Sequence, residues 1–328
     1  MNVIADNRWI GSHGIGRFAT EVLQRISYTS IGINGSPSSP FDPLRLSVEL
    51  NKKANRGGLF FSPGYNAPFF YNGELAITIH DLIHLDVKEE SSALKSLYYK
   101  TVVLPTVKKS KVIFTVSQYS KNKIVEWANI DESKIIVVGN GVDHLFFENE
   151  KKFEGGCKFF IYVGNQRPHK NTDFMIRAFS KISKYSNAKL LMTGRLTLEN
   201  KKLVKELDIE ESVVELGFVE ECDLPMYYKG ASALIMPSLY EGFGLPVIEA
   251  MASGTLVLSS CTSCLPEVAG DAALYFDPRE ENQLVNAMLY ALGDDPEIAK
   301  KLLLGKQHAS TYQWDEVAQK VASGLFSF

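Results

Sequence analysis

Several features that mark particular classes of protein are missing from this sequence. There is no surplus of basic residues, because 35 lysines and arginines stand against 38 aspartates and glutamates, so no nucleic-acid partner is expected. No apolar stretch approaches the ~20 residues of a membrane-spanning helix. No basic-plus-apolar leader opens the chain. Together these absences predict a soluble, cytoplasmic protein.

Cysteine is scarce, with four residues among 328. Cys261 and Cys264 have the spacing of half a zinc or redox motif, but no second pair stands at a matching distance. An Asp-x-Asp motif, which could hold a divalent cation, is also absent. We therefore expect reduced thiols, no metal and no cofactor.

The sequence does contain a regular alternation of short apolar runs and longer amphipathic stretches. Strand-like runs occur at 2–5, 59–62, 75–79, 111–116, 159–163, 188–193 and 233–236. Helices are predicted between them, among others at 15–28 and 91–110, and residues 32–43 read as an exposed loop. Such alternation predicts an α/β protein with doubly wound parallel sheets. The length suits two domains, with the polar segment Glu148–Gly156 as the hinge.

The most informative stretch is Ser238–Leu258, which reads as a loop, a helix and a strand. Its two-glycine loop leads into a helix with Pro246 in the first turn, a position where proline is tolerated. Backbone amides at such a helix start bind anions. Glu241 and Glu249 flank these amides and can accept hydrogen bonds from sugar hydroxyls. We interpret the segment as a sugar–diphosphate site; a surface glycine turn with two solvated glutamates is the simpler alternative.

The segment YEGFGLPVIE, with its Glu-x7-Glu spacing, resembles the retaining glycosyltransferases of family 4. The resemblance implies the GT-B fold, which has two Rossmann-like doubly wound domains facing across a cleft. Residues 1–150 would form the acceptor-side domain, with helix 313–328 packing back on it, and residues 151–312 the donor-binding domain. In that family the first glutamate, here Glu241, contacts the donor sugar, and the second, Glu249, binds the ribose. The diphosphate is held by the loop amides, here those of Gly242, Phe243, Gly244 and Leu245.

A second cluster follows the strand at 159–163. Cationic side chains after a strand end can meet a phosphate, and the resemblance assigns this place to the diphosphate, with Gly164 and Lys170 matching the family pattern. Asn165 stands where an arginine is more usual, so Arg167 either substitutes from a different angle or does not contribute. The same resemblance places Arg195 on the donor side and lays Phe218 and Val219 along the nucleobase.

The first half of the chain carries fewer signals. Gly14-x-Gly16-x-x-Ala19 matches a dinucleotide fingerprint only formally, because no acidic residue follows at the required distance. In the resembling family this loop lies over the donor diphosphate, here at Gly16, and over the acceptor entrance, here at Gly14 and Arg17. A solvated residue at a helix start explains Arg17 equally well.

A histidine follows the strand at 75–79, and ligands gather at the carboxyl ends of strands in open α/β sheets. In the family a histidine at this point faces the transferred sugar, so His80 is a catalytic candidate and Asp81 an acceptor-side one. Farther on, Ser120 is expected to cap a helix rather than bind a ligand.

Between Lys88 and Lys111 six lysines stand against two glutamates, among aromatic residues. Such a face can contact an anionic membrane peripherally, on its inner side. An ordinary solvated helix whose aromatic residues enter the core accounts for the same pattern.

The resemblance implies metal-independent, retaining transfer of a sugar from a nucleoside-diphosphate donor to a hydroxyl of a glycan or lipid-linked glycan. In this interpretation Glu241, Lys170, Arg167 and His80 are catalytic. The sequence looks most like bacterial mannosyl- and rhamnosyltransferases of O-antigen or capsule synthesis, with GDP-mannose as the first choice of donor. A nucleotide-sugar epimerase of the same fold, or a non-enzymatic nucleotide-sugar binding protein, remains an alternative.

Overall fold

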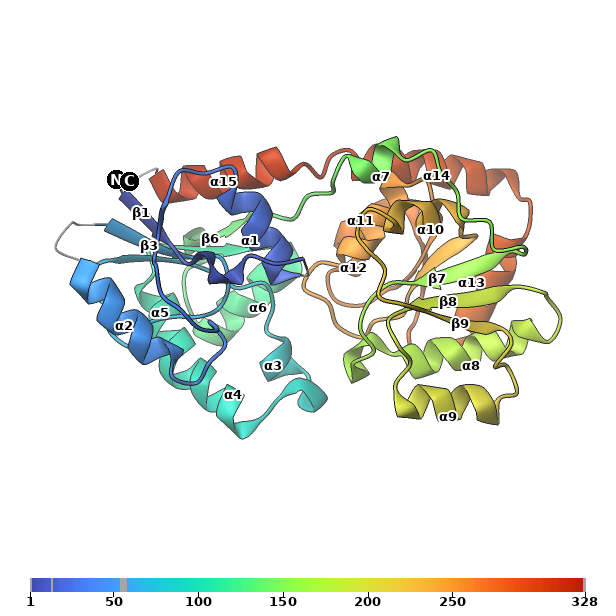
Figure 1. The fold of residues 1–328 in the computed structure, drawn as a ribbon, viewed down its shortest axis with the longest axis horizontal. Coiled ribbons are helices and arrows are strands. Elements are labelled where there is room, and N and C mark those ends of the chain that lie inside the picture. The colour runs from blue at the N-terminus through green and yellow to red at the C-terminus, as the bar shows by residue number, and fades with distance from the viewer. Residues whose placement is uncertain (1, 13, 54–57, 327–328) are drawn as a thin grey trace. The chain divides into compact units, whose positions relative to one another are not determined.

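The computed structural model describes residues 2–12, 14–53 and 58–326. The chain divides into two compact units, which we call unit 1 (Met1–Gly141 with Gln313–Phe328) and unit 2 (Val142–Tyr312). Each unit is built around its own six-stranded sheet, and all the paired strands are parallel (Figure 1).

The sheet of unit 1 has the strand order β2-β1-β3-β4-β5-β6. Its strands are β1 (Asn2–Ala5), β2 (Thr29–Ser30), β3 (Gly58–Ser62), β4 (Glu74–Thr78), β5 (Val112–Thr115) and β6 (Ile135–Val137). The chain winds one way from β1 to β2 and then crosses back to β3 on the other side of β1. The point where the winding reverses therefore lies between β1 and β3, and such switch points are where ligands bind in sheets of this kind.

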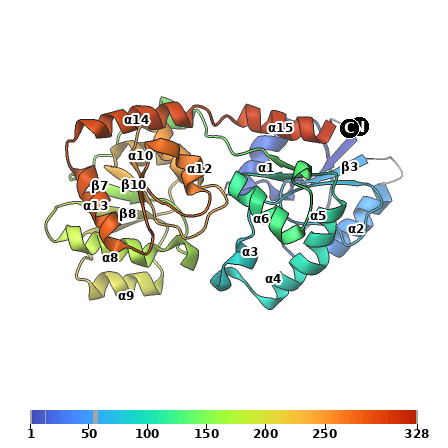
Figure 2. The ribbon, with the colours of Figure 1, turned by 180° about the vertical axis from the view of Figure 1, so that it is seen from behind.

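Helices cover both faces of this sheet (Figures 1 and 2). One face carries α2 (Asp42–Lys53), α4 (Ala93–Tyr98), α5 (Leu104–Lys109) and α6 (Gln118–Ala128), and the other carries α1 (Ile15–Leu23) and α15 (Trp314–Phe326). The short helix α3 spans Ile83–Asp86, and single turns span Asn7–Trp9, Lys88–Glu90 and Glu132–Lys134. Ile77, Ile113 and Ile135 pack against α4–α6, whereas Phe60 and Leu75 pack against α2.

The sheet of unit 2 has the order β12-β11-β10-β7-β8-β9, with its switch point between β7 and β10. Its strands are β7 (Phe159–Tyr162), β8 (Lys189–Thr193), β9 (Val213–Gly217), β10 (Ala233–Met236), β11 (Val257–Ser260) and β12 (Leu274–Phe276). One face carries α8 (Thr172–Ser183), α9 (Leu198–Glu206) and α13 (Glu281–Leu292), and the other carries α7 (Leu145–Glu148), α10 (Leu224–Gly230), α11 (Leu245–Ala252), α12 (Leu265–Ala269) and α14 (Pro296–Ala309). Single turns span Pro168–Lys170 and Gly270–Ala272.

Three local predictions need correction. The first helix ends at Leu23, not near residue 28, and β2 follows it. The loop expected over 32–43 gives way at Asp42 to α2, which the sequence analysis missed together with α9. The helix predicted over 91–110 is interrupted by a π-helical segment, Tyr99–Val103, in which the Leu104 amide reaches back to the Tyr99 carbonyl. Pro105 has no backbone N–H to donate to a carbonyl one turn earlier, and prolines inside helices cause irregular turns of this kind.

The division between the units falls at Gly141, ahead of the expected boundary at residue 150 and of Glu148–Gly156. Helix α7 belongs to unit 2 because its buried Phe146 lies against Tyr228, with ring centroids 6.0 Å apart. The first and last residues of unit 2 are hydrogen-bonded to each other: the Val142 amide donates to the Tyr312 carbonyl at 3.1 Å. The chain then returns to unit 1 as α15; residues 327–328 of the predicted helix lie outside the described residues.

Candidate functional site

The switch point of unit 2 holds an ion pair. Lys170 ends the turn after β7, Glu241 lies in the loop after β10, and their Nζ and Oε1 atoms are 2.6 Å apart. Both side chains are largely buried, at 16% and 10% exposure. A short charge-assisted contact of this kind fixes both groups at the carboxyl edge of the sheet. The structure thus brings together two residues predicted to act on one ligand.

The loop around Lys170 is held by contacts in its own backbone and to neighbouring strands. Gly164, at φ 151°, donates its amide to Thr193 Oγ1 at 3.0 Å. The Tyr162 hydroxyl donates to the carbonyl of Asn165, and burial, followed by the charge of Glu241, raises the pKa of Tyr162. Next to Lys170, the Asn171 side chain donates to the carbonyls of Pro237 (3.2 Å) and Pro278 (2.9 Å). The lysine is therefore anchored to the ends of two other strands.

Arg167 and Asn165 differ from Lys170 in their surroundings. Both side chains are exposed, and Asn165 Oδ1 accepts the Arg167 amide at 3.3 Å. Asn165 therefore shapes the loop backbone in addition to occupying the position where the family more often has an arginine. Lys170 is the more buried cation of the two candidates.

The loop carrying Glu241 is braced by the segment after β11. Ser263 Oγ accepts the Glu241 amide at 3.0 Å, and Thr262 Oγ1 donates to the Ser238 carbonyl at 3.0 Å. The Cys264 thiol donates to the carbonyls of Glu241 (3.2 Å) and Phe243 (3.3 Å). Burial raises the pKa of Cys264, so the thiol keeps its proton for these contacts. The Cys-x-x-Cys segment, noted in the sequence as half a motif, thus contains a cysteine that supports the glutamate loop.

Helix α11 starts directly behind this loop. Gly244 precedes it in the left-handed region at φ 96°, and a Cβ there would lie 2.8 Å from Leu265 Cδ2. The Phe243 side chain is buried against Tyr312, at 5.7 Å between ring centroids, so only its backbone belongs to the predicted anion site. Gly242 and Leu245 lie in the same loop and first turn. The loop that carries Glu241, the ion partner of Lys170, therefore leads directly into the first turn of α11, and helix starts of this kind can bind anions.

Glu249 lies one helical turn into α11 and is half-buried. Its Oε2 atom accepts a hydrogen bond from the Tyr228 hydroxyl at 3.0 Å. Burial and then the charge of Glu249 raise the pKa of Tyr228, which keeps the phenol protonated as a donor. Tyr228 therefore fixes the orientation of the carboxylate predicted to bind ribose.

The remaining donor-side candidates line the adjacent loops at the ends of β8 and β9. The Arg195 side chain is exposed, and its carbonyl accepts from Gln166 Nε2 at 3.1 Å, which ties it to the Lys170 loop. The Gly194 amide donates to the Gly217 carbonyl at 2.6 Å. Beyond Gly217, Phe218 is 71% exposed and Val219 is half-buried. An aromatic ring that exposed is available to stack on a planar ligand.

In unit 1, His80 follows β4. Its Nε2 atom lies 2.9 Å from the Pro63 carbonyl, and its ring meets Phe18 edge-on at 4.9 Å. Burial lowers the pKa of His80 to about 4, so the ring is neutral at pH 7. Because a carbonyl only accepts, the contact places the proton on Nε2 and leaves Nδ1 as an acceptor.

The residues near His80 have local structural partners. Asp81 Oδ1 accepts the Ile83 amide at 3.0 Å, which fixes the turn into α3. The predicted role of Ser120 as a helix cap is wrong: Ser117 caps α6, its Oγ accepting the Ser120 amide at 3.1 Å. Ser120 instead donates its hydroxyl to the His80 carbonyl at 3.0 Å, and so supports the candidate histidine.

The glycine loop before α1 is tightly packed. A Cβ on Gly16 would lie 3.0 Å from the backbone of Gly11, and Gly14 precedes the helix at φ 49°. The alternative in which Arg17 is a solvated residue at a helix start is wrong. Its side chain is 11% exposed, and its Nε lies 3.2 Å from Glu21 Oε1. If Arg17 contacts the acceptor, it does so while it is paired with Glu21.

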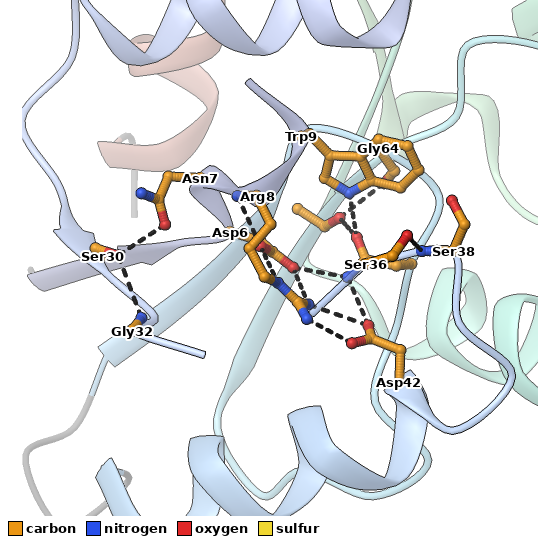
Figure 3. A network of polar contacts seen from close by, with 12 residues as sticks. Asp6, Asn7, Arg8, Trp9, Ser30, Gly32, Ser36, Ser38, Asp42 and Gly64 are labelled. Atoms are coloured by element: carbon orange, nitrogen blue, oxygen red, sulfur yellow. Dashed lines mark hydrogen bonds and ion pairs between the residues drawn. The ribbon is translucent and has the colours of Figure 1, made fainter. Parts of the chain in front are cut away.

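A buried polar network that was not predicted from the sequence lies at the switch point of unit 1 (Figure 3). The Arg8 guanidinium contacts two carboxylates: Nη2 lies 2.6 Å from Asp6 Oδ2 and Nη1 lies 2.5 Å from Asp42 Oδ1. Asn66 Nδ2 donates to Asp6 at 2.7 Å, and Asn66 Oδ1 accepts from Trp9 Nε1 at 2.6 Å. Although burial alone would lower it, hydrogen bonds to Asp6 and Asp42 raise the pKa of Arg8. The only local signal was Asp-x-Arg directly after β1.

Two parts of the chain match glycosyltransferase families. Residues 143–303 match the family described as glycosyl transferases group 1, and residues 58–144 match glycosyltransferase family 4. The O-antigen chain mannosyltransferase RfbU of Salmonella typhimurium is 30% identical over 251 residues, covering 76% of this chain and 68% of the relative. O-antigen chain mannosyltransferase B of Escherichia coli is 27% identical over 269 residues, covering 76% and 71%.

Solved structures with the same architecture include HepE of Anabaena in complex with UDP-glucose, with a TM-score of 0.79, 14% identity and full coverage of both chains. WaaG, a glycosyltransferase involved in lipopolysaccharide biosynthesis, has a TM-score of 0.76 and 13% identity, again with full coverage. The fold is that of the GT-B glycosyltransferases, as predicted. The chain belongs to the glycosyltransferase family defined by the group 1 and family 4 domains.

Proposed function

We propose that the chain is a retaining glycosyltransferase that moves a mannosyl group from GDP-mannose to a hydroxyl of a glycan or lipid-linked glycan in polysaccharide synthesis. The observation that carries the proposal is the Lys170–Glu241 pair beside the amides that open α11, at the switch point of unit 2. A cation and aimed amides bind a diphosphate, and a carboxylate beside them binds sugar hydroxyls.

In the proposed reaction the bond between the sugar C1 and the diphosphate oxygen breaks, and a bond from C1 to the acceptor oxygen forms on the same face. The acceptor proton passes to the leaving phosphate. Negative charge grows on that phosphate, so Lys170 and the amides of Gly242–Leu245 stabilise it by fixed electrostatics. In this scheme they take the place of a metal ion. Glu241 orients the sugar, and neutral His80 offers Nδ1 as a hydrogen-bond acceptor.

The choice of mannose rests on the relatives, two of which are named O-antigen mannosyltransferases. The choice of nucleotide is open to a direct test, since HepE was solved with UDP and UDP-glucose. Thermal shift with GDP, UDP and dTDP tests donor binding, because a ligand at ~100 times its Kd stabilises the folded state by ~2.7 kcal/mol. We expect GDP to give the largest shift and Glu249→Gln to reduce it. No shift with any of the three would contradict the proposal.

Product analysis separates this function from its alternatives. Incubation with labelled GDP-mannose and a glycan acceptor should yield a labelled glycosidic product with the anomeric configuration kept. A labelled nucleotide sugar of changed configuration would indicate an epimerase. Tight donor binding with neither product would indicate a binding protein.

We further propose that unit 1 contacts an anionic membrane surface through α4. Leu94 and Leu97 on this helix are 79% and 55% exposed, and Lys100, Lys108 and Lys109 follow on the same helical stretch with exposed side chains. Exposed apolar side chains next to lysines are typical of surfaces that meet anionic lipid. No helix within residues 2–12, 14–53 and 58–326 is long and apolar enough to cross a membrane.

Vesicle co-sedimentation tests this contact. Changing both Leu94 and Leu97 to Gln should reduce binding to vesicles that contain phosphatidylglycerol, because the apolar contact with the lipid is lost. Leu198→Gln is the matched control, because Leu198 is 82% exposed on α9 of unit 2. Equal sedimentation of the double variant and the wild type would exclude the α4 contact.

A further inference from the structure

Unit 1 has its own switch point, between β1 and β3, and aromatic side chains follow both strands there. Trp9 ends the turn after β1, and Tyr65 lies three residues after the end of β3. Their ring centroids are 5.3 Å apart with planes tilted by 57°, and both side chains are half-buried. The position is the one where a doubly wound sheet binds its ligands.

Trp9 is held in place from two directions. Its Nε1 donates to Asn66 Oδ1 at 2.6 Å. Its ring lies so close to Gly64 that a Cβ there would come within 2.4 Å of Trp9 Cε2 (Figure 3). Tyr65 is anchored separately, stacked on the buried Tyr99 at 6.0 Å. Rings fixed in this way lose little entropy when a ligand binds.

The network beneath Trp9 is expensive to bury. It contains two carboxylates and one guanidinium, with side-chain exposures of 0% for Asp6, 1% for Asp42 and 8% for Arg8. Well-packed apolar side chains in place of a buried charged network often give an equally stable or more stable protein. Stability alone therefore does not explain why these charges are buried here. A network with all its polar groups paired does, however, define one geometry. In this protein the geometry it defines is that of Asn66 and hence of Trp9.

One short loop connects these aromatic residues to the candidate catalytic histidine. Residues 63–66 supply the Pro63 carbonyl that His80 contacts at 2.9 Å, the glycine under Trp9, Tyr65 itself, and the Asn66 side chain. A ligand on Trp9 and Tyr65 would therefore be located by the same loop that locates His80. His84, 6.3 Å from Tyr65 between ring centroids, adds a polar group to the cluster.

We propose that Trp9 and Tyr65 form a platform for a pyranose ring of the acceptor glycan. A pyranose has an apolar face of C–H groups and a rim of hydroxyls, which suits rigid aromatic faces beside a few polar groups. The residues belong to unit 1, whereas the Lys170–Glu241 site belongs to unit 2. The assignment to the acceptor rests on the proposed transferase function.

The test measures glycan binding without a donor. Mannotriose, maltotriose and chitotriose are titrated into wild type, Trp9→Ala, Trp9→Phe and Trp127→Phe, with tryptophan fluorescence and calorimetry as readouts. Trp127 is the matched control, a half-buried tryptophan of unit 1 that lies on α6 against Tyr99 at 5.9 Å. We expect Trp9→Ala to raise the Kd of the trisaccharide that binds by about tenfold, the size of one lost aromatic contact. Trp9→Phe should lose the fluorescence response and keep most of the affinity, and Trp127→Phe should keep both.

Binding of GDP, UDP and dTDP to the same four proteins separates the two proposals. If one of these nucleotides binds all four equally while Trp9→Ala alone weakens glycan binding, the platform is supported. If a nucleotide binds but Trp9→Ala binds the glycan as the wild type does, the platform is overturned and the proposed transferase stands. A wild-type chain that responds to none of the three trisaccharides also overturns the platform. A wild-type chain that binds none of the three nucleotides would count against the proposed transferase instead.

Discussion

At the scale of single residues, the donor-side candidates differ in how deeply they are buried. Lys170 is 16% exposed and paired with Glu241, whereas Arg167 is exposed in a loop shaped by Asn165. A cation that stabilises a leaving phosphate acts through a fixed position, because no reorganisation is then needed as the charge develops. Lys170 therefore meets this requirement better than Arg167 does.

Replacement of Lys170 by Ala should lower turnover by ~10²–10³, the loss typical of a removed charge-stabilising donor. Arg167→Ala should have a smaller effect. Lys181→Ala is a suitable control, since Lys181 lies in the last turn of α8, at the end away from Lys170, and pairs with Glu281 at 2.8 Å. Steady-state rates with saturating donor check the order. Activity of Lys170→Ala within a few-fold of wild type would make Arg167 the main cation.

The lowered pKa of His80 predicts how the stability of the protein depends on pH. Its pKa is lowered from 6.5 to about 4 by burial, so below pH 6.5 the unfolded chain binds this proton while the folded chain does not. Stability from this group is complete above pH 6.5 and is lost as the pH falls toward 4, by at most about 3 kcal/mol. His80→Gln should therefore lose less stability than wild type between pH 6.5 and 4, in urea unfolding. The exposed His144→Gln is the control and should behave as wild type.

At the scale of elements, the loop before α11 depends on a glycine that no other residue replaces freely. Gly244 has φ 96° and lies against the buried Leu265. Gly244→Ala should lower stability by about 1–2 kcal/mol through the positive φ, and should also weaken nucleoside-diphosphate binding because the loop must shift. Calorimetry and thermal unfolding measure the two effects.

Gly254→Ala provides the control for this change. Gly254 ends the same helix at φ 74°, with open space where a Cβ would lie. Its replacement should carry a similar backbone penalty and leave nucleotide affinity unchanged. Equal affinities for Gly244→Ala and Gly254→Ala would remove the loop amides from the donor site.

The elements also show what sequence patterns could predict. Strands of unit 2 were predicted closely, because buried parallel strands read as apolar runs, and β10 begins and ends where expected. Helix α9 was missed because its sequence, LENKKLVKE, is mostly polar and buries only Asn200, Leu203 and Val204. Helix α2 was missed because the preceding Gly, Ser and Pro residues read as a loop.

The residues of the site were predicted from the sequence in part, but their contacts with one another were not. Glu241 and Glu249 were found because both belong to one short local motif. Their pairing with Lys170 and Tyr228 depends on residues from other strands and helices, and no local pattern records it. The Asp6–Arg8–Asp42–Asn66 network is more dispersed still, since its members come from three segments of unit 1. Only the fold brings such residues together.

At the scale of the whole molecule, the chain leaves unit 1 at Gly141, builds unit 2, and returns at Gln313. Unit 1 therefore includes α15, which follows unit 2 in the sequence. The Arg25–Asp315 pair, at 2.7 Å, contributes little because the Asp315 side chain is 89% exposed. Close packing is the stronger contact: a Cβ on Gly324 would lie 2.6 Å from Phe114 Cε1 and 2.9 Å from Ile136 Cδ1.

Gly324→Ala therefore tests whether unit 1 needs α15 in this position. Alanine favours a helix over glycine by about 1 kcal/mol, so a net loss of stability can be assigned to the clash with Phe114. We expect overpacking to outweigh that gain and to lower stability by about 1–3 kcal/mol. Gln319→Ala, at an exposed position of the same helix, should stay within about 0.5 kcal/mol of wild type. Nucleoside-diphosphate affinity should be unchanged in both, because Lys170, Glu241 and Glu249 belong to unit 2. A Gly324→Ala protein as stable as Gln319→Ala would show that α15 does not pack this tightly on β5.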